Sequence, residues 1–196
     1  FDELYSANAI VAYKRERVRA HILKYLMPGS HILELNSGTG EDALYFAALG
    51  HSVHATDISA DMLRVLNGKV NAAGLNYMVT SEQCSFNNLQ NLRQAGPYDA
   101  VFSNFGGLNC TGRLHEVLQS LPALLKAGGT ATLVIISRFC LWEFLLLFRG
   151  KFKTATRRLF AKKGAGAHIE GEYFKCWYYG AGYVLKHTAN AFEAVN

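Results

Sequence analysis

The stretch HILELNSGTGEDALYF, residues 31–46, decides the fold class. It opens with a short apolar run that contains Glu34, continues through a turn rich in glycine, and begins a helical pattern at Glu41. A buried strand, a glycine turn and a helix in this order are typical of the first unit of a parallel α/β sheet. Such sheets bind ligands at the carboxyl ends of their strands, so the turn after Leu35 is a candidate site.

Strands and helices alternate on both sides of this stretch. The expected helices cover 13–27, 41–49, 59–73 and 113–126, and the expected strands cover 31–35, 52–56, 77–80, 99–103 and 130–137. Short apolar runs that alternate with amphipathic helices predict a parallel sheet with helices on both faces. We therefore expect an α/β, Rossmann-like, doubly wound and mostly parallel sheet.

One domain is expected over residues 1–196, because a chain of 196 residues, half of them hydrophobic, can bury one core. Its expected parts are a helical cap over 1–28, a ligand-binding core over 29–138, an irregular region over 139–182 and a helix over 183–196. Irregular regions on a regular scaffold usually recognise substrates, so we assign 139–182 to a substrate or lid region.

The glycine turn fits two kinds of nucleotide-like ligand. Gly38, Gly40 and Ala43 satisfy the loose dinucleotide pattern G-x-G-x-x-G/A, and Asp57 ends the next strand, where an acid can bind ribose hydroxyls. A bare G-x-G turn can also be a plain strand-to-helix connection. The pattern alone therefore leaves both NAD and other ligands with a ribose open.

The acidic residues around the turn favour a ligand with a cationic end. Glu34, Glu41 and Asp42 would oppose a pyrophosphate at the helix N-terminus, where each like-charge approach costs on the order of 1 kcal/mol. The same acids suit S-adenosylmethionine (SAM), which carries an ammonium, a sulfonium and a ribose but no phosphate. Complementarity to the helix dipole is an alternative explanation for Glu41 and Asp42, but it does not account for Glu34.

Three segments resemble the class I SAM-dependent methyltransferases. HILELNSGTGEDALYFAALGHSVHATDISADML (31–63) is similar to the first two motifs of that family, YDAVFSNFGGLNC (98–110) to its fourth-strand motif, and LLKAGGTATLVII (124–136) to the entry of its fifth strand. SRFCLWEFLLLFRG (137–150) also resembles a bacterial subgroup with small-molecule substrates. The resemblance covers about 29–138 and implies a methyltransferase (EC 2.1.1.-) with SAM as its cofactor.

The resemblance implies roles for individual residues. Glu34 would orient the loop or bind the ammonium of SAM, and Asp57 would accept hydrogen bonds from both ribose hydroxyls. The other implied cofactor-binding residues are Gly38 and Gly40 at the close backbone approach, Ile58 and Met62 beside the adenine ring, Ser85 and Phe86 at the end of its pocket, and Asn104, Phe105 and Gly106 toward the methionine moiety. Asn36 is also an implied cofactor-binding residue. It replaces the first glycine of the family's G-x-G-x-G motif, and asparagine tolerates unusual backbone angles better than most residues.

The sequence assigns no catalytic residue. Methyl transfer from a sulfonium is an in-line displacement that can depend on proximity and water exclusion, and it needs a base only if the acceptor holds its proton. The candidates for such a base are His115, His168, Tyr173, Tyr178 and Tyr179. A structural role is the alternative for each of them.

The acceptor class is expected to be a small or lipid-like molecule. The aromatic stretches FCLWEFLLLF (139–148) and YFKCWYYG (173–180) suggest walls of a hydrophobic pocket, with core and lid packing as the alternative. The segment NFGG (104–107) lacks the prolines of (D/N/S)-P-P-(Y/F/W), which disfavours methylation of nucleic-acid bases. The basic run over 149–163 keeps an RNA acceptor open, and a non-catalytic SAM-binding protein and an NAD-dependent oxidoreductase are further alternatives.

The remaining features concern location and metals. The four scattered cysteines predict free thiols in a reducing cytoplasm, and they predict no metal site because none forms a C-x-x-C pair. No apolar run is long enough to span a membrane, and arginines interrupt the N-terminal pattern, so we expect neither a transmembrane segment nor a signal peptide. The family completes its sheet with two further strands, which the sequence up to Asn196 is not expected to supply.

Overall fold

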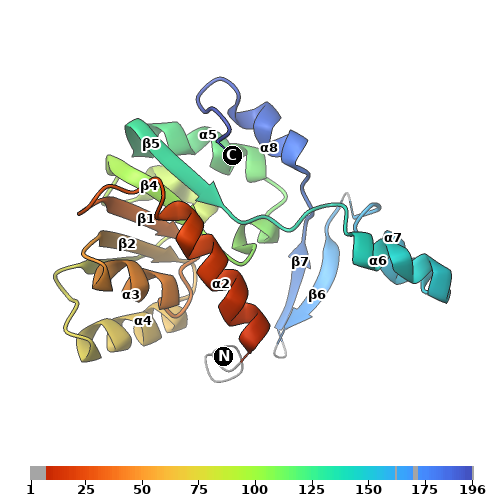
Figure 1. Cartoon of the computed structure of the whole chain (residues 1–196), viewed down its shortest axis with the longest axis horizontal. Coiled ribbons are helices and arrows are strands. Elements are labelled where there is room, and N and C mark those ends of the chain that lie inside the picture. Colours follow the sequence, from red (N-terminus) through yellow and green to blue (C-terminus); the bar gives the residue numbers. More distant parts are fainter. Residues whose placement is uncertain (1–7, 162, 170–171, 196) are drawn as a thin grey trace. The chain divides into compact units, whose positions relative to one another are not determined.

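The computed structural model describes residues 8–161, 163–169 and 172–195 (Figure 1). The chain divides into two compact units. Unit 1 holds Phe1–Asn104 and Ser120–Val134, and unit 2 holds Phe105–Gln119 and Ile135–Asn196. Each unit has its own β-sheet. The expectation that residues 1–196 form one functional domain remains a prediction.

The sheet of unit 1 has five parallel strands in the order β3-β2-β1-β4-β5. The strands are β1 (His31–Leu35), β2 (Ser52–Asp57), β3 (Val79–Gln83), β4 (Tyr98–Ser103) and β5 (Leu125–Leu133). The predicted α/β, Rossmann-like class is confirmed. The strand order reverses between β1 and β4, and ligands of open parallel sheets bind beside the carboxyl ends of two such strands.

Three helices of unit 1 follow from caps and apolar spacing that are visible in the sequence. They are α2 (Ala9–Ile22), α3 (Glu41–Ala48) and α4 (Ala60–Ala72). Ser59 caps α4, because its side chain accepts a hydrogen bond from the backbone N–H of Met62. The helix predicted over 13–27 corresponds to α2. It begins earlier than predicted because Asn8 caps it by accepting from two backbone N–H groups, and it ends at Ile22.

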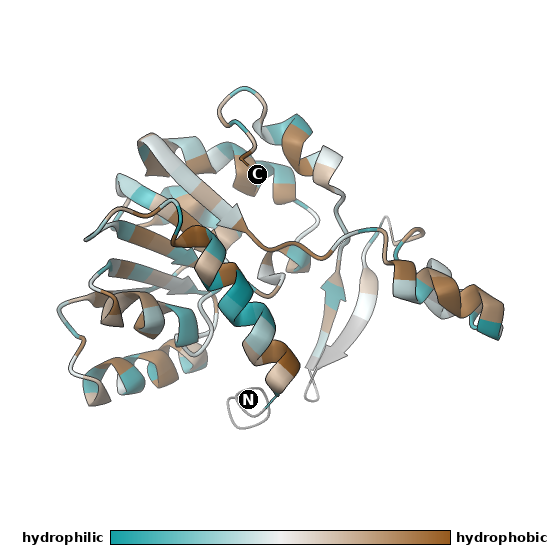
Figure 2. Ribbon diagram, viewed as in Figure 1, coloured by the Kyte–Doolittle hydropathy of each residue, from teal (hydrophilic) through white to brown (hydrophobic). Residues whose placement is uncertain are grey.

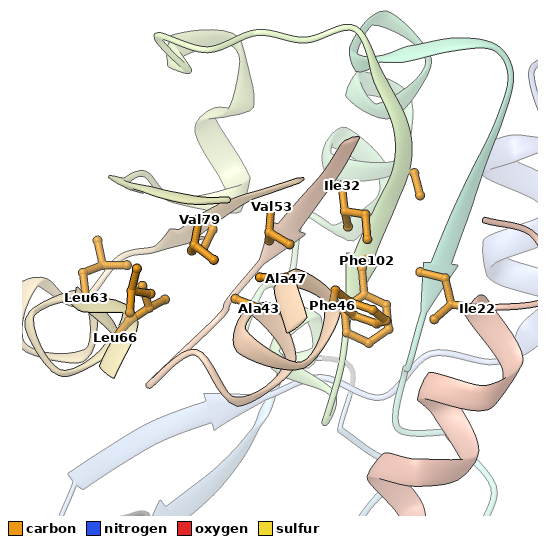
Figure 3. Packing of buried hydrophobic residues seen from close by; sticks show 13 residues of the cluster. Ile22, Ile32, Ala43, Phe46, Ala47, Val53, Leu63, Leu66, Val79 and Phe102 are labelled. Carbon is orange, nitrogen blue, oxygen red and sulfur yellow. The ribbon is translucent and has the colours of Figure 1, made fainter. Parts of the chain in front are cut away.

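The core of unit 1 lies between the sheet and these helices (Figure 3). Phe46 of α3 meets Phe102 of β4 edge to face, with 5.1 Å between ring centroids. The buried strand residues that share this side are Ile32, Val53, Ala55, Val79, Ala100 and Phe102. Neighbouring strand residues point to the other face of the sheet, and Leu33 and Leu35 are also fully buried there. Burial on both faces explains the continuous apolar run of β1.

The third strand lies later in the chain than predicted. We expected 77–80, whereas β3 covers Val79–Gln83 and includes the polar residues Ser81, Glu82 and Gln83. It is an edge strand, where polar residues are common. Glu82 is tied down there, because it accepts hydrogen bonds from the backbone N–H of Arg93 and contacts the ring of His54 at 3.2 Å.

The segment before the fifth strand also differs from the prediction. A single helix was expected over 113–126. The structure has a shorter helix, α5 (Leu114–Ser120), followed by a 3-10 turn, η3 (Leu121–Leu124). Pro122 explains the break, because it has no N–H to continue the helical ladder. The fifth strand begins at Leu125 rather than at Thr130 and ends at Leu133. Its glycine pair had hidden the start from the apolar pattern.

Unit 2 contains short elements where an irregular region was expected. They are η2 (Gly107–Cys110), α5, α6 (Leu141–Leu145), η4 (Leu146–Arg149), α7 (Phe152–Thr156), β6 (Ala165–Ile169), β7 (Glu172–Cys176) and α8 (Ala181–Thr188). β6 and β7 form an antiparallel hairpin separate from the five-stranded sheet. The helix expected over 183–196 begins two residues earlier and ends at Thr188, within the described part of the chain.

Asn109 joins three segments of unit 2. Its fully buried side chain donates to the carbonyls of Ile136 and Trp177 and accepts from the N–H of Ile136 at 2.7 Å. Its backbone carbonyl accepts from the N–H of Trp177 at 2.7 Å. The segments around residues 109, 136 and 177 share no β-sheet. Asn109 thus supplies the hydrogen bonds that join these three segments.

Candidate functional site

The candidate site lies at the carboxyl edge of the sheet of unit 1. Glu34 and Asn36 belong to β1 and its loop, Asp57 ends β2, and Asn104 follows β4. The register pairs Glu34 with Ala55 of β2 and with Phe102 of β4, so β1 lies between the other two strands. The parallel sheet therefore gathers these four predicted residues at one edge.

Asn36 fills a position that normally favours glycine. Its φ is 49°, in the left-handed region, which asparagine adopts at a lower cost than most residues. Its side-chain oxygen accepts from the hydroxyl of Ser103 at 2.6 Å, and its amide donates to the carbonyl of Asn104 at 3.2 Å. The departure from the glycine motif is therefore compatible with the loop, and it links the end of β1 to the end of β4.

The two glycines of the turn differ in their surroundings. Gly38 has φ +54°, and, apart from its chain neighbours, no atom of the described residues lies within 4 Å of the place where a Cβ would stand. Gly40 has φ +83°, and a Cβ there would come within 2.5 Å of the side chain of Leu66 on α4. Gly38 thus has open space beside it, whereas the space beside Gly40 is filled by the helix packing of unit 1. Contact of either glycine with the cofactor stays a prediction.

Asp57 holds the turn in place. One carboxylate oxygen accepts from the N–H of Gly38 at 2.9 Å, and the other accepts from the N–H of Ser59 at 2.9 Å. Each carboxylate oxygen can accept a second hydrogen bond, so these contacts leave capacity for the two hydroxyls of a ribose. Asp57 is half-buried. The predicted ribose contact is compatible with this arrangement.

Glu34 is a buried acid with an unsatisfied oxygen. It is 3 % exposed, and its Oε2 has no hydrogen-bond partner among the described residues. Burial raises the pKa of Glu34 well above its usual range; the nearby carboxylates of Asp42 and Asp57 raise it further, while Arg19 and Arg15 act in the opposite direction. A carboxylate in this position would gain from a cationic ligand group, such as the ammonium of SAM.

The other two acids of the turn have partners within the protein. Asp42 is buried, lies 2.6 Å from the Nε of Arg19, and accepts from the amide of Asn104 at 3.0 Å. Glu41 lies 2.6 Å from the Nζ of Lys69. Basic side chains therefore already neutralise Glu41 and Asp42, which agrees with the alternative that their charge serves the protein itself. Glu34 differs from them, because its Oε2 has no partner among the described residues.

The end of the third strand is joined to the end of the second. The side-chain amide of Gln83 donates to the carbonyl of Ile58 at 2.9 Å, and the N–H of Cys84 donates to the carbonyl of Asp57 at 3.0 Å. Ile58 is 68 % exposed, and Met62, Ser85 and Phe86 are half-buried. These four residues therefore lie on chain segments linked at this edge, and their contact with adenine stays a prediction.

Ser85 has a structural partner as well as a predicted ligand role. Its hydroxyl accepts from the N–H of Asn87 at 3.3 Å and caps the short helix η1 (Phe86–Asn91). The hydroxyl hydrogen is not used in that contact, so Ser85 could donate to an adenine nitrogen. The predicted place of Ser85 at the end of the adenine pocket stays a prediction.

Ser37 is a further polar residue of the loop, which the sequence did not single out. Ser37 is 9 % exposed, and its buried hydroxyl has no partner among the described residues, while its N–H donates to the carbonyl of Thr56. An unsatisfied buried hydroxyl between Asn36 and Gly38 is a candidate ligand contact. The position of Ser37 inside the glycine motif could have identified it as a candidate, but the motif is defined only by its acid and its glycines.

The two remaining predicted residues, Phe105 and Gly106, begin unit 2. Phe105 has φ 53° and is 44 % exposed. Gly106 has φ +71°, and a Cβ there would come within 2.7 Å of the side chain of Ile136. Gly106 is therefore required for close packing inside unit 2, and a role of either residue toward the methionine moiety stays a prediction.

The candidate bases differ strongly in their environment. Tyr179 is buried, its hydroxyl donates to the carbonyl of Thr111, and burial raises its pKa to about 12, so it keeps its proton near neutral pH. Burial also raises the pKa of Tyr178. Tyr173 is 79 % exposed, the ring of His115 lies 5.9 Å from that of His187, and the side chain of His168 lies outside the described residues. None of these contacts assigns a base.

Two further features concern metals and membranes. The described residues contain no group of three or more His, Cys, Asp or Glu side chains that could hold a metal ion. Within the same described residues, no helix combines the length and the apolar character that a membrane span needs.

Comparison with known proteins identifies the class. A family model described as a methyltransferase domain matches residues 32–129, half of the chain. The chain therefore belongs to the methyltransferase-domain family, and the predicted membership among SAM-dependent methyltransferases is confirmed. The matched residues include the turn, Asp57, the strands β2 to β4 and all of β1 except His31. SAM, the predicted cofactor, is the methyl donor of this class.

Individual relatives agree with this class. The chain is 28 % identical over 136 residues to an uncharacterized methyltransferase of Synechocystis, which covers 67 % of this chain and 60 % of that protein. It is 32 % identical over 75 residues to the tuberculostearic acid methyltransferase UfaA1 of Mycobacterium tuberculosis. The aligned region covers 38 % of this chain and 16 % of UfaA1. The chain thus spans less than two thirds of both curated relatives.

A solved structure confirms the fold. A SAM-dependent methyltransferase of Methanosarcina mazei superposes with a TM-score of 0.65 at 20 % identity, over 87 % of this chain and 82 % of that chain. Likeness at this identity concerns the fold alone.

Proposed function

We propose that this protein transfers a methyl group from SAM to a small or lipid-like acceptor by in-line displacement. The observation that carries the proposal is the unsatisfied, buried Oε2 of Glu34 beside a turn that Asp57 holds in place, within a methyltransferase domain. A buried carboxylate without a cationic partner disfavours the free protein and favours binding of a cation. A pyrophosphate would instead bring a second negative charge to Glu34, which argues against NAD.

The residues of unit 1 would divide the work of holding the cofactor. Glu34 would bind the ammonium directly or through water, Asp57 would accept from the ribose hydroxyls, and the open side of Gly38 would admit the ligand close to the backbone. When bound, SAM supplies a methyl group on a sulfonium whose departure needs no acid. The contribution of the protein is then to position the two reactants and to exclude water.

The acceptor class has weaker support. UfaA1, which its name describes as a tuberculostearic acid methyltransferase, is similar to 38 % of this chain, and that similarity favours a lipid-like acceptor. No described contact identifies a base, which is compatible with an acceptor atom that carries no proton to remove. A cytoplasmic location remains part of the proposal, supported by four free cysteines.

Calorimetric titration of the purified protein with SAM, S-adenosylhomocysteine and NADH tests the cofactor. We expect SAM and its product to bind, NADH not to bind, and Asp57→Ala to lose the binding. Asp61→Ala is the matched control, because Asp61 is an exposed acid of α4 paired only with Arg64 among the described contacts. Binding of NADH, or unchanged SAM binding in Asp57→Ala, would contradict the proposal.

Methyl transfer needs its own test. The protein is incubated with SAM labelled in the methyl group and, separately, with a lipid extract, a small-molecule extract and structured RNA. Label in the lipid or small-molecule fraction supports the proposed acceptor class. Label confined to RNA would replace it with the RNA alternative, and SAM binding without any transfer would favour the non-catalytic alternative.

A further inference from the structure

Unit 2 contains an arm whose large side chains are unusually exposed. We define the arm as residues 137–160, which include α6, η4 and α7. Trp142 is 81 % exposed and Phe148 is 84 % exposed. Further large apolar side chains of the arm that are at least one third exposed are Phe139, Leu141, Phe144, Leu145, Phe152 and Phe160. Figure 2 draws most of α6 in the brown of hydrophobic residues.

The arm is closed at its base and therefore has a defined shape. Arg158 donates to the carbonyl of Ser137 at 3.0 Å, and Arg138 donates to the carbonyl of Leu159 at 3.0 Å, so the chain enters and leaves the arm at one place. Inside the arm, both oxygens of Glu143 accept from Arg157 and Arg158. The exposed apolar residues thus belong to a folded element with its own polar contacts.

These residues were expected to line a pocket or to pack in a core. The exposure of Trp142 and Phe148 excludes core packing for both of them in the structure. Large apolar side chains exposed together on one short segment are typical of surfaces that bind a protein, a ligand or a membrane.

The charge of the arm region identifies the partner. Residues 138–163 contain eight of the chain's 20 Lys and Arg residues and one of its 15 Asp and Glu residues, so their formal net charge is +7 and that of the rest is −2. The one acid, Glu143, is already paired with two arginines. Arg149, the last residue of η4, and Lys151, between η4 and α7, are exposed. The partner is therefore both apolar and anionic.

We propose that the arm binds the surface of an anionic lipid bilayer, with Trp142 and Phe148 in the boundary between headgroups and acyl chains and with Arg149 and Lys151 at the lipid phosphates. Exposed aromatic and leucine side chains combined with lysine and arginine are typical of segments that lie in the plane of the membrane interface. The arm has no need to cross the bilayer, and its helices of four or five residues are too short to do so.

Two other occupants fit less well. RNA would neutralise the basic residues, but its phosphates would leave the leucines and phenylalanines of α6 and η4 in water. A second copy packed arm against arm would cover the apolar side chains, but it would bring together two segments, residues 137–160 of each copy, with a formal net charge of +5 each. A bilayer with anionic lipids satisfies both requirements. The proposal does not depend on methyl transfer, since it concerns residues outside the candidate cofactor site.

The test measures binding of the whole protein to vesicles without SAM. The vesicles contain either phosphatidylcholine alone or phosphatidylcholine with an equal amount of phosphatidylglycerol. We expect the anionic vesicles to bind the protein at least about tenfold more tightly, with an affinity that falls as salt is added. In Trp177→Phe, which leaves Trp142 as the only tryptophan, we expect a blue shift of the emission and quenching by lipids brominated in their acyl chains.

Variants locate the binding surface. Trp142→Glu with Phe148→Glu is expected to weaken binding at least about tenfold, since both apolar anchors are lost. Arg149→Gln with Lys151→Gln is expected to weaken binding to anionic vesicles roughly 25-fold, about fivefold for each basic residue. Tyr77→Glu, at an 81 % exposed residue of unit 1, and Lys14→Gln with Arg17→Gln, at exposed bases of α2, are the matched controls, and we expect no change in either.

Three outcomes would overturn the proposal. The first is that the arm variants bind vesicles as tightly as the unchanged protein. The second is that the arm binds structured RNA more tightly than anionic vesicles. The third is a stable dimer in sedimentation velocity that Trp142→Glu with Phe148→Glu converts to a monomer. Thermal unfolding of each variant verifies that a loss of binding is not a loss of folding.

Discussion

Two glutamates, one in each unit, illustrate opposite uses of a carboxylate. Glu34 of β1 is buried, its Oε2 has no partner among the described residues, and burial raises its pKa well above the usual range. Glu143 of the arm accepts from two arginine side chains, and these hydrogen bonds lower its pKa to about 2. The first carboxylate destabilises the fold in its charged form, whereas the second stabilises the fold because it is charged.

The difference teaches where each unit can bind a charged ligand. Glu143 has no capacity left for a cation, because its neighbours already supply two. Glu34 lacks a basic partner of this kind. The bases beside the turn are paired with other acids, Arg19 with Asp42 and Lys69 with Glu41. A ligand that brings a cation to Glu34 thus stabilises the protein by binding.

The largest expected effect concerns SAM affinity. Glu34→Gln should raise the Kd for SAM about 100-fold, because a charge-assisted hydrogen bond in a buried site is worth roughly 2–3 kcal/mol. Calorimetric titration measures it. Glu143→Gln is the matched control, with an unchanged Kd expected. Equal affinities of the unchanged protein and Glu34→Gln would remove Glu34 from the cofactor site.

The same substitution should act on stability with the opposite sign. The folded state binds a proton at Glu34 more tightly than the unfolded state, so stability falls as pH rises from the usual pKa of glutamate toward the raised pKa of Glu34. Glu34→Gln removes this loss and should increase the free energy of unfolding by about 1–3 kcal/mol at neutral pH. Chemical denaturation at several pH values measures the gain, which should shrink toward pH 4. A variant less stable than the unchanged protein would contradict the account of Glu34.

A smaller loss is expected at the other glutamate. Glu143→Gln removes the acceptor of Arg157 and Arg158 and should destabilise the arm by about 1 kcal/mol, a modest value because Arg157 is half exposed. The pKa of Glu143 is lowered, so its contribution is complete above the usual pKa of glutamate and is lost as pH falls toward 2. Amide hydrogen exchange of residues 141–158 measures the opening of the arm. Unchanged exchange at neutral pH would mean that the pairs do not hold the arm closed.

The smallest effect is expected at the loop of unit 1. Asn36→Gly loses the hydrogen bonds to Ser103 and Asn104 but removes the cost of the left-handed backbone, so the net loss of stability should be only about 0.5 kcal/mol. Asn36→Ala loses the bonds and keeps the backbone cost, and it should be clearly less stable. Thermal unfolding of both variants distinguishes them. A more stable Asn36→Gly would mean that the hydrogen bonds contribute little.

The strands of unit 1 could be predicted because they are buried on both faces and therefore read as short apolar runs. β1 was predicted to the residue, and β2 and β4 to within one residue. The prediction was wrong at β3 and β5, where the edge position and the glycine pair Gly128 and Gly129 remove the apolar signal. Turn chemistry and burial thus explain both the agreement and the differences.

The partners of the site residues could not be predicted, because they come from distant positions. Arg19 lies 23 residues before Asp42, and Lys69 lies 28 residues after Glu41. No pattern in the sequence marks these pairs, so the acids of the turn looked more available than they are. The exposure of the arm was equally hidden, since an apolar run that lies on the surface and one that lies in a core have the same composition.

The contacts of Asn109 have a consequence for the order of folding during synthesis. Its buried amide bonds to the carbonyl of Trp177, and the carbonyl of Thr111 accepts from Tyr179, so the segment at 105–119 depends on partners 68 residues further along the chain. The ribosome releases those partners long after the strands of unit 1. Residues 105–119 therefore have to wait, with the side chain of Asn109 in water, until residues 177–179 have also emerged.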